Sequence, residues 1–113
     1  MKFIIKRSNW LRGKGSFRSR LLNDYGEMCC LGFLGKACGM SKRTLYGQTC
    51  PIMVDEFGVR YPEKIINAKT KSNTKACKRL MVTNDSERIK DSDREKSLKR
   101  QFKRIGITVK FID

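Results

Sequence analysis

The cysteines are the first residues whose chemistry could define a site. The chain has five of them, Cys29, Cys30, Cys38, Cys50 and Cys77. A zinc site could be assembled from Cys29 or Cys30 with the other three, because four thiolates satisfy tetrahedral zinc. However, the chain has no histidine and no Cys-x-x-Cys pair, the spacing that makes such sites recognisable. We therefore expect reduced structural thiols, with no metal site and no cofactor.

Acidic residues form a second group with catalytic potential. Those between positions 85 and 95 are Asp85, Glu87, Asp91, Asp93 and Glu95. Carboxylates that converge on Mg²⁺ would support a metal-dependent nuclease. Helix capping and loop solvation explain the cluster more simply. Without histidine the chain also lacks Ser-His and Cys-His nucleophiles and histidine acid–base chemistry. We expect a protein that is not an enzyme.

The charge balance is the strongest positive signal. The 113 residues include 26 Lys and Arg but only 11 Asp and Glu, which gives a net charge of +15. An excess of this size favours an anionic partner, most commonly nucleic acid, although a merely solubilising surface is the alternative. No apolar run approaches the ~18 residues of a membrane span, and the N-terminus is too short in apolar residues for a signal peptide. We expect a cytoplasmic protein with no membrane partner.

Two clusters of basic residues are candidates for contacts with nucleic-acid phosphates. The first, in the acid-free first twenty residues, comprises Lys6, Arg7, Arg12, Lys14, Arg18 and Arg20. The second comprises Lys96, Lys99, Arg100, Lys103 and Arg104. The second cluster is mostly lysine, and the predicted helix that carries it begins with an acidic turn. Both features favour contact with the nucleic-acid backbone over base reading. The two clusters could form one surface or two, and the alternative for the second is an ordinary solvated helix face.

A glycine-rich basic loop at residues 12–16, Arg-Gly-Lys-Gly-Ser, interrupts the first cluster. It lacks the spacing of a Walker A loop. Its backbone N–H groups could still bind phosphate. The alternative is that the loop is a simple connector.

The segments that must position these side chains are clearest near the C-terminus. Residues 92–104 combine helical apolar spacing with a capping box formed by Ser92 and Glu95, which predicts a helix. Gly106 should end this helix. Residues 107–112 alternate and are β-branched, which predicts a strand.

The most apolar stretch, residues 26–39, predicts a buried helix from about Cys29 to Gly39. Gly39 suits the left-handed position that follows a helix. Gly32 and Gly35 each cost roughly 1 kcal/mol inside a helix relative to alanine. Because they lie near one face, we expect another element to approach the helix backbone closely there.

Weaker patterns predict the remaining elements. These are strands at residues 3–7, 18–22 and 52–54, a helical turn capped by Ser8, and helices at residues 41–47, 63–66 and from residue 72 or 73 to about 84. Together they predict a single α+β domain over residues 1–113. In it, two or three helices pack on a short, mainly antiparallel sheet.

Several segments resemble a group of small uncharacterised bacteriophage proteins. The resemblance rests on Trp-Leu-Arg-Gly at residues 10–13, Gly-Glu-Met-Cys-Cys-Leu-Gly-Phe at 26–33, Ala-Cys-Gly at 37–39, Leu-Met-Val-Thr-Asn-Asp at 80–85, and the ending at 106–113. The group brings no assigned activity. The resemblance implies a phage origin and expression in the cytoplasm of an infected bacterium.

Charge and resemblance together favour two functions. The first is a basic phage accessory protein that binds DNA or RNA through phosphates, in host takeover or regulation. The second is an inhibitor or adaptor that binds a host protein or ribonucleoprotein, such as an anti-defence (anti-CRISPR-like) factor. The choice between DNA and RNA and the oligomeric state stay open.

Overall fold

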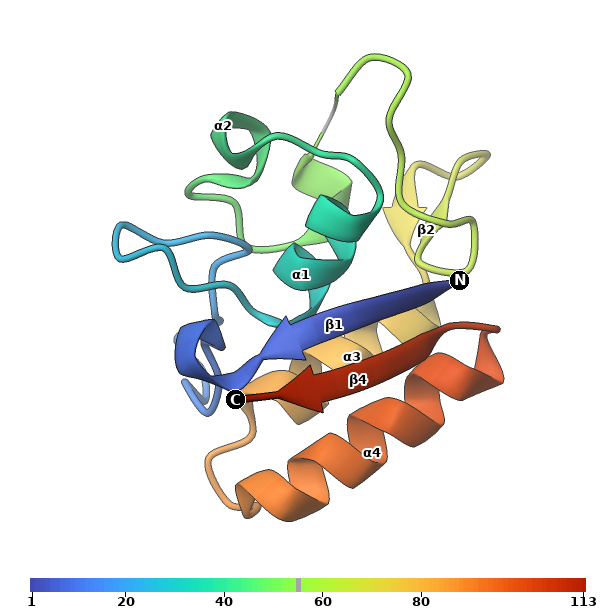
Figure 1. The fold of residues 1–113 in the computed structure, drawn as a ribbon. Coiled ribbons are helices and arrows are strands. Elements are labelled where there is room, and N and C mark those ends of the chain that lie inside the picture. The colour runs from blue at the N-terminus through green and yellow to red at the C-terminus, as the bar shows by residue number, and fades with distance from the viewer. Residues whose placement is uncertain (55) are drawn as a thin grey trace.

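A computed structural model describes residues 1–54 and 56–113 (Figure 1). The strands are β1 (Lys2–Lys6), β2 (Ile66–Asn67), β3 (Ser72–Asn73) and β4 (Thr108–Ile112). The α-helices are α1 (Cys30–Ala37), α2 (Lys42–Leu45), α3 (Lys75–Asp85) and α4 (Asp91–Arg104). Two 3-10 turns are η1 (Arg7–Asn9) and η2 (Pro51–Met53). The predicted α+β class is confirmed.

The principal sheet pairs the first strand with the last. β1 and β4 run parallel, with Phe3 opposite Val109 and Ile5 opposite Phe111. These four side chains are buried, and the alternate residues of both strands are exposed. The expectation of a mainly antiparallel sheet is wrong for this pair. Antiparallel neighbours usually come from hairpins, whereas these strands are joined through helices, which can return the chain in the same direction. Only the short β2–β3 pair is antiparallel.

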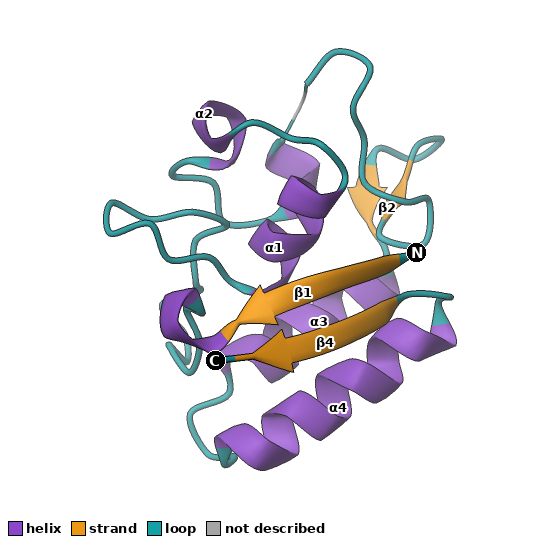
Figure 2. Ribbon diagram, viewed as in Figure 1, coloured by secondary structure: helices purple, strands orange, loops and turns teal. Residues whose placement is uncertain are grey.

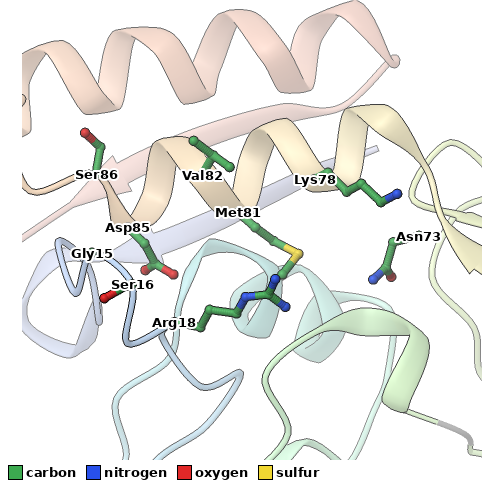
Figure 3. Close-up of a pocket in the computed structure, with 9 residues that line it drawn as sticks. All are labelled: Gly15, Ser16, Arg18, Asn73, Lys78, Met81, Val82, Asp85 and Ser86. Carbon is green, nitrogen blue, oxygen red and sulfur yellow. The ribbon is translucent and has the colours of Figure 1, made fainter.

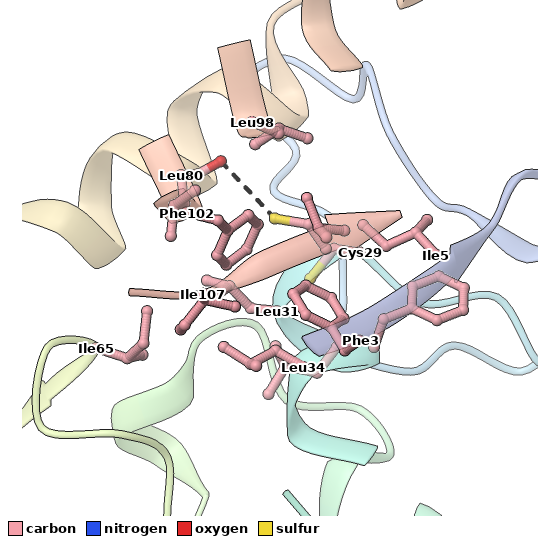
Figure 4. Close-up of a cluster of buried hydrophobic side chains, with 14 of the residues drawn as sticks. Phe3, Ile5, Cys29, Leu31, Leu34, Ile65, Leu80, Leu98, Phe102 and Ile107 are labelled. Carbon is pink, nitrogen blue, oxygen red and sulfur yellow. Dashed lines mark hydrogen bonds between the residues drawn. The ribbon is translucent and has the colours of Figure 1, made fainter. Parts of the chain in front are cut away.

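Helices cover one face of this sheet. α1 packs against β1, α4 runs along β4, and α3 lies behind the strands in contact with α1 and α4 (Figure 2). The core between them includes Phe102, whose ring meets that of Phe3 edge-on at 5.1 Å (Figure 4). The opposite face of the sheet is open and carries Lys2, Ile4, Lys6, Thr108, Lys110 and Ile112.

The predicted end of the central helix is confirmed at Gly39. This residue has φ +99°, and its N–H donates to the carbonyl of Lys36 at 3.0 Å. The next N–H, of Met40, donates to the carbonyl of Gly35 at 3.0 Å. These two bonds form a Schellman motif, which satisfies carbonyls that the end of α1 leaves free.

The close approach predicted at the two helix glycines is also confirmed. A Cβ atom at Gly32 would overlap the backbone carbonyl of Leu21. A Cβ atom at Gly35 would lie 2.6 Å from the hydroxyl oxygen of Tyr61 and 2.9 Å from Leu45 Cδ2. Tyr61 in turn donates a 2.6 Å hydrogen bond to the carbonyl of Leu31. The glycines therefore let three other segments, those of Leu21, Leu45 and Tyr61, lie against α1.

Two predicted strands are wrong. Residues 18–22 satisfy their backbone groups one at a time, through a bond from Leu21 N–H to the carbonyl of Gln48 at 2.7 Å and an isolated bridge between Leu22 and Tyr46. Residues 52–54 fail because Pro51 opens the 3-10 turn η2 instead. Separate tertiary partners therefore replace a continuous strand ladder at residues 18–22, and local turn geometry replaces it at residues 52–54.

Four predicted helices or helical turns also differ from the structure. Ser8 lies inside η1, which has no side-chain cap, rather than capping a helical turn. Residues 63–66 form only a single turn before β2, with the carbonyl of Pro62 accepting from Ile65 and Ile66. α4 begins one residue early at Asp91, so Ser92 is not its cap. α3 begins later than predicted, at Lys75, with the Thr74 side chain as its cap. The predicted cap at Ser41 is confirmed, because its side chain caps α2.

Candidate nucleic-acid interface

Arg7, one of the first basic cluster, is held by carboxylates. Its Nε and Nη2 atoms each lie 2.8 Å from the Glu95 carboxylate, and Nη1 lies 2.9 Å from Asp113. These contacts, chiefly that with Glu95, raise the pKa of the guanidinium. Glu95 therefore ties η1 to α4 instead of serving in a capping box. The guanidinium of Arg7 is therefore already paired with two carboxylates.

Arg12 is committed in a similar way. Its Nη2 lies 2.9 Å from the Asp91 carboxylate, and its guanidinium carbon stands 4.5 Å from the centre of the Trp10 ring. Nη1 donates to the carbonyl of Trp10 at 2.8 Å. The hydrogen bond from Arg12 is the main reason why the pKa of Asp91 is lowered.

Arg94 is a buried arginine that no local pattern distinguished from its basic neighbours. Its Nη1 donates to the carbonyls of Thr83 and Asn84, both at 2.8 Å, and Nη2 donates to that of Ile89 at 3.2 Å. Its Nε also lies 3.3 Å from Asp91. Arg94 therefore closes the C-terminal end of α3 and fixes the connection to α4.

The glycine-rich loop at residues 12–16 also hydrogen-bonds to the C-terminal end of α3. Gly13 N–H donates to the carbonyl of Asn84 at 2.9 Å, and Gly15 N–H donates to that of Asp85 at 2.6 Å. The Asp85 carboxylate accepts from both the N–H and the hydroxyl of Ser19. The N–H groups of both loop glycines are therefore already bonded within the protein and do not face a phosphate. The geometry favours the connector interpretation of residues 12–16 over phosphate binding by its backbone.

A basic groove lies between α3 and α4. It encloses about 500 Å³ and receives Lys78 and Arg79 from α3 and Arg100 and Arg104 from α4. No carboxylate from the part of the chain that the structure describes lines it. Polar side chains complete the walls, namely Thr83, Ser97 and Gln101. Gln101 Nε2 donates to the hydroxyls of the other two at 2.7 and 3.0 Å. Four cations therefore line the groove, and none of the described residues in its walls carries a negative charge.

The second basic cluster is divided by this packing. Arg100 and Arg104 enter the groove, whereas Lys99 stands over the Phe111 ring at 5.8 Å, and Lys96 and Lys103 are exposed outside the groove. Lys78 and Arg79, which α3 contributes to the groove, were not among the predicted site residues. Their signal was present, because they lie opposite the apolar side of that helix.

A second hollow continues the groove toward the N-terminal loops. It encloses about 710 Å³ and shares Lys78 and Val82 with the groove (Figure 3). Arg18 reaches it from the first basic cluster and lies near Met81, while Lys78 extends toward Asn73 on the other side. Arg18 of the first basic cluster thus lines the same hollow as Lys78, which also lines the groove.

A third hollow, of about 240 Å³, adjoins the second at Arg18. Lys14 and Arg20 line it, together with the rings of Phe17 and Tyr25. We call the path through the three hollows the basic track; its cations are Arg104, Arg100, Arg79, Lys78, Arg18, Lys14 and Arg20. Lys6 lies outside the track, on the open face of the sheet.

The cysteines are scattered through the core as free thiols. Burial raises the pKa of Cys29 and of Cys77 to about 12. Within residues 1–54 and 56–113, no group of three or more Cys, Asp or Glu side chains is arranged to hold a metal ion. Neither the cysteine set considered for zinc nor the carboxylates considered for a nuclease are gathered there.

Comparison with protein-family models, with curated proteins and with solved structures finds no match to this chain. None of the described helices is both long enough and apolar enough to cross a bilayer.

Proposed function

We propose that this protein binds nucleic acid through phosphate contacts along the basic track. The observation that carries the proposal is the α3–α4 groove, where Lys78, Arg79, Arg100 and Arg104 converge and none of the described carboxylates lines the walls. Cations that face one another repel and destabilise the compact state, and an anionic ligand relieves that repulsion.

The chemistry of the walls supports phosphate as the anion. Arginine guanidinium groups bind phosphate oxygens in pairs of parallel hydrogen bonds. Hydroxyl side chains such as those of Thr83 and Ser97 are also common phosphate donors. Contacts of this kind carry no direct sequence information. We therefore infer a binding mode that depends on charge and shape rather than on base sequence.

The proposed setting is host takeover or regulation by a phage, in the cytoplasm of an infected bacterium. It rests on the resemblance of several segments to bacteriophage proteins. Three of these segments meet at Asn84. Its side chain accepts from Trp10 Nε1 at 2.9 Å and from Cys30 N–H at 3.0 Å. These three segments therefore share one packing centre.

A second candidate function is binding to a host protein or ribonucleoprotein, as an inhibitor or adaptor. The observation that favours it is the open face of β1 and β4, where Ile4 is 52% exposed and Ile112 36% exposed. Lys2, Lys6 and Lys110 share that face. A mixed apolar and basic face of this kind suits an acidic protein surface.

Titration of labelled oligonucleotides at two salt concentrations separates the two functions. Binding to the track should weaken steeply with salt, because each phosphate contact releases counterions. Absence of binding to bare DNA and RNA at low salt, together with recovery of one host protein whose capture is lost in an Ile4→Glu variant, would favour the second function.

A further inference from the structure

We propose that the ligand of the basic track is unpaired nucleic acid, with bases that stack on Phe17 and Tyr25. This inference rests on the proposed function and narrows it to one class of ligand. Phe17 is 86% exposed and Tyr25 is 88% exposed, and both rings line the third hollow. Large rings that face water beside cations are the features with which proteins hold single strands.

Both rings stand on loops whose backbones are fixed. The Phe17 loop is pinned on either side, by the bond from Gly15 N–H to the carbonyl of Asp85 and by the two bonds from Ser19 to the Asp85 carboxylate. The ring of Phe17 nevertheless stays exposed, so these bonds fix the loop without covering the ring. Fixed loops reduce the entropy lost when a ligand is bound.

The turn that carries Tyr25 is organised by one side chain. Asn23 Oδ1 accepts from the N–H of Tyr25 at 3.0 Å and from that of Glu27 at 2.8 Å. Asn23 Nδ2 also donates to the Glu27 carboxylate at 3.0 Å. The tip of the turn is held by these bonds, and the ring remains outside them.

Charge around the rings favours a polyanion. Lys14, Arg18 and Arg20 line the third hollow, and among its described residues Asp24 is the only carboxylate. That carboxylate accepts a hydrogen bond from the hydroxyl of Tyr46. Cations can therefore meet phosphates while the rings meet bases. Stacking tolerates any sequence because every base has a π face.

The shape of the track favours a single strand over a duplex. Arg18 joins the third hollow to the second, and Lys78 joins the second to the α3–α4 groove, so the path bends around α3. A duplex keeps its bases stacked internally, and bending it over a short site costs deformation energy. An unpaired strand can turn at each nucleotide and offer its bases to the rings.

The test measures affinity by fluorescence anisotropy for an unstructured 15-nucleotide strand, as DNA and as RNA, and for the 15-base-pair duplex of the same sequence. The Phe17→Ala and Tyr25→Ala variants are compared with Phe57→Ala, which removes a fully exposed ring outside the three hollows. We expect the wild type to prefer the single strand. Each track variant should lose at least about fivefold in single-strand affinity. Phe57→Ala should lose no affinity. None of the three variants should change the slope of log affinity against log salt.

Equal affinity for strand and duplex, or track variants that behave like Phe57→Ala, would overturn the inference; steep salt dependence in that case would leave the proposed function standing. If neither oligonucleotide binds at low salt, the proposed function and the inference fall together. A third arm uses phosphatidylserine vesicles. Vesicle binding that needs Phe17, without a preference for single strands, would overturn the inference in favour of a membrane surface.

Discussion

The indole nitrogen of Trp10 donates a 2.9 Å hydrogen bond to the side-chain oxygen of Asn84, across 74 positions of sequence. The same oxygen accepts from Cys30 N–H at 3.0 Å at the start of α1, and Asn84 Nδ2 donates to the carbonyl of Leu11 at 3.0 Å. Asn84 is buried at the end of α3. One amide thus joins the N-terminal segment, the central helix and α3.

Replacing this amide should destabilise the fold strongly. Asn84→Leu leaves the Trp10 indole N–H, the Cys30 N–H and the Leu11 carbonyl buried without a partner. Each such group costs about 1–3 kcal/mol, so we expect a loss of at least about 3 kcal/mol in the free energy of unfolding. Urea titration followed by the fluorescence of Trp10, the single tryptophan, measures it. The exposed Asn9→Ala should change stability by less than about 0.5 kcal/mol, and an equal effect of both variants would contradict the role of Asn84.

Gly35 should not tolerate a larger side chain. Because a Cβ atom there already crowds Tyr61 and Leu45, Gly35→Leu should destabilise by about 1–3 kcal/mol through overpacking. Ala37→Leu enlarges an exposed position of the same helix and is the matched control. Thermal unfolding of both variants checks this. An unchanged melting temperature for Gly35→Leu would remove the packing explanation of the glycine.

Cations of the groove should contribute more to polyanion binding than cations of the open sheet face. Replacing Arg100 and Arg104 with alanine should reduce the slope of log affinity against log salt by roughly 1.4 to 1.8, since each lost phosphate contact removes about 0.7 to 0.9. The matched control replaces Lys2 and Lys110, which removes the same charge from the open face of the sheet. Equal slopes for the two double variants would show that only total charge matters.

Charge reversal along α4 offers a further check. Reversing Lys99, Lys103 and Arg104 should leave folding intact, because all three side chains are exposed, and should weaken polyanion binding. Circular dichroism reports the fold and anisotropy reports binding. Unaltered affinity with an intact fold would contradict the place of Arg104 in the interface.

Thiol accessibility should distinguish Cys38 from the other cysteines. Cys38 is half-buried, whereas Cys29, Cys30, Cys50 and Cys77 are buried. The pKa of about 12 at Cys29 and Cys77 keeps these thiols neutral and unreactive near pH 8. We expect one of the five thiols to react with Ellman's reagent in the folded protein and the rest only in denaturant. Rapid reaction of several thiols without denaturant would contradict the buried arrangement.

Asp91 should give the fold a small pH dependence. Its pKa is lowered, first by the hydrogen bond from Arg12, so the folded state favours the charged carboxylate. The resulting stabilisation is complete above the unfolded pKa of about 3.9 and is lost as pH falls through the lower folded value. Because the side chain is half exposed, Asp91→Asn should reduce stability by less than about 1 kcal/mol at pH 7. The difference from wild type should vanish in acid; a constant difference would argue against the ionic origin.

Periodic burial explains which elements could be predicted from sequence. α4 and β4 are visible in the chain because each buries one stripe or one alternate face against the core. The end of α1 is visible because Gly39 supplies the left-handed residue. The parallel pairing of β1 with β4 leaves no such local mark, because the direction of pairing is decided by the helices between the strands.

The candidate site was less predictable for a related reason. Arg7 has the same local surroundings as an exposed cation, and only the fold brings Glu95 and Asp113 to it. Conversely, Lys78 and Arg79 become part of a site only when α3 packs beside α4. Sequence reports how many cations there are, whereas tertiary packing decides which of them keep a carboxylate neighbour.

The pairing of the first strand with the last also governs when the protein can fold. Phe3 and Ile5 have no strand partner until the ribosome has delivered Val109 and Phe111. A contact of such long sequence separation closes slowly, and the apolar side of β1 stays uncovered during synthesis. Assembly of this sheet therefore waits until residues 108–112 have left the ribosome, and the interval before it is when the nascent chain is most exposed to aggregation.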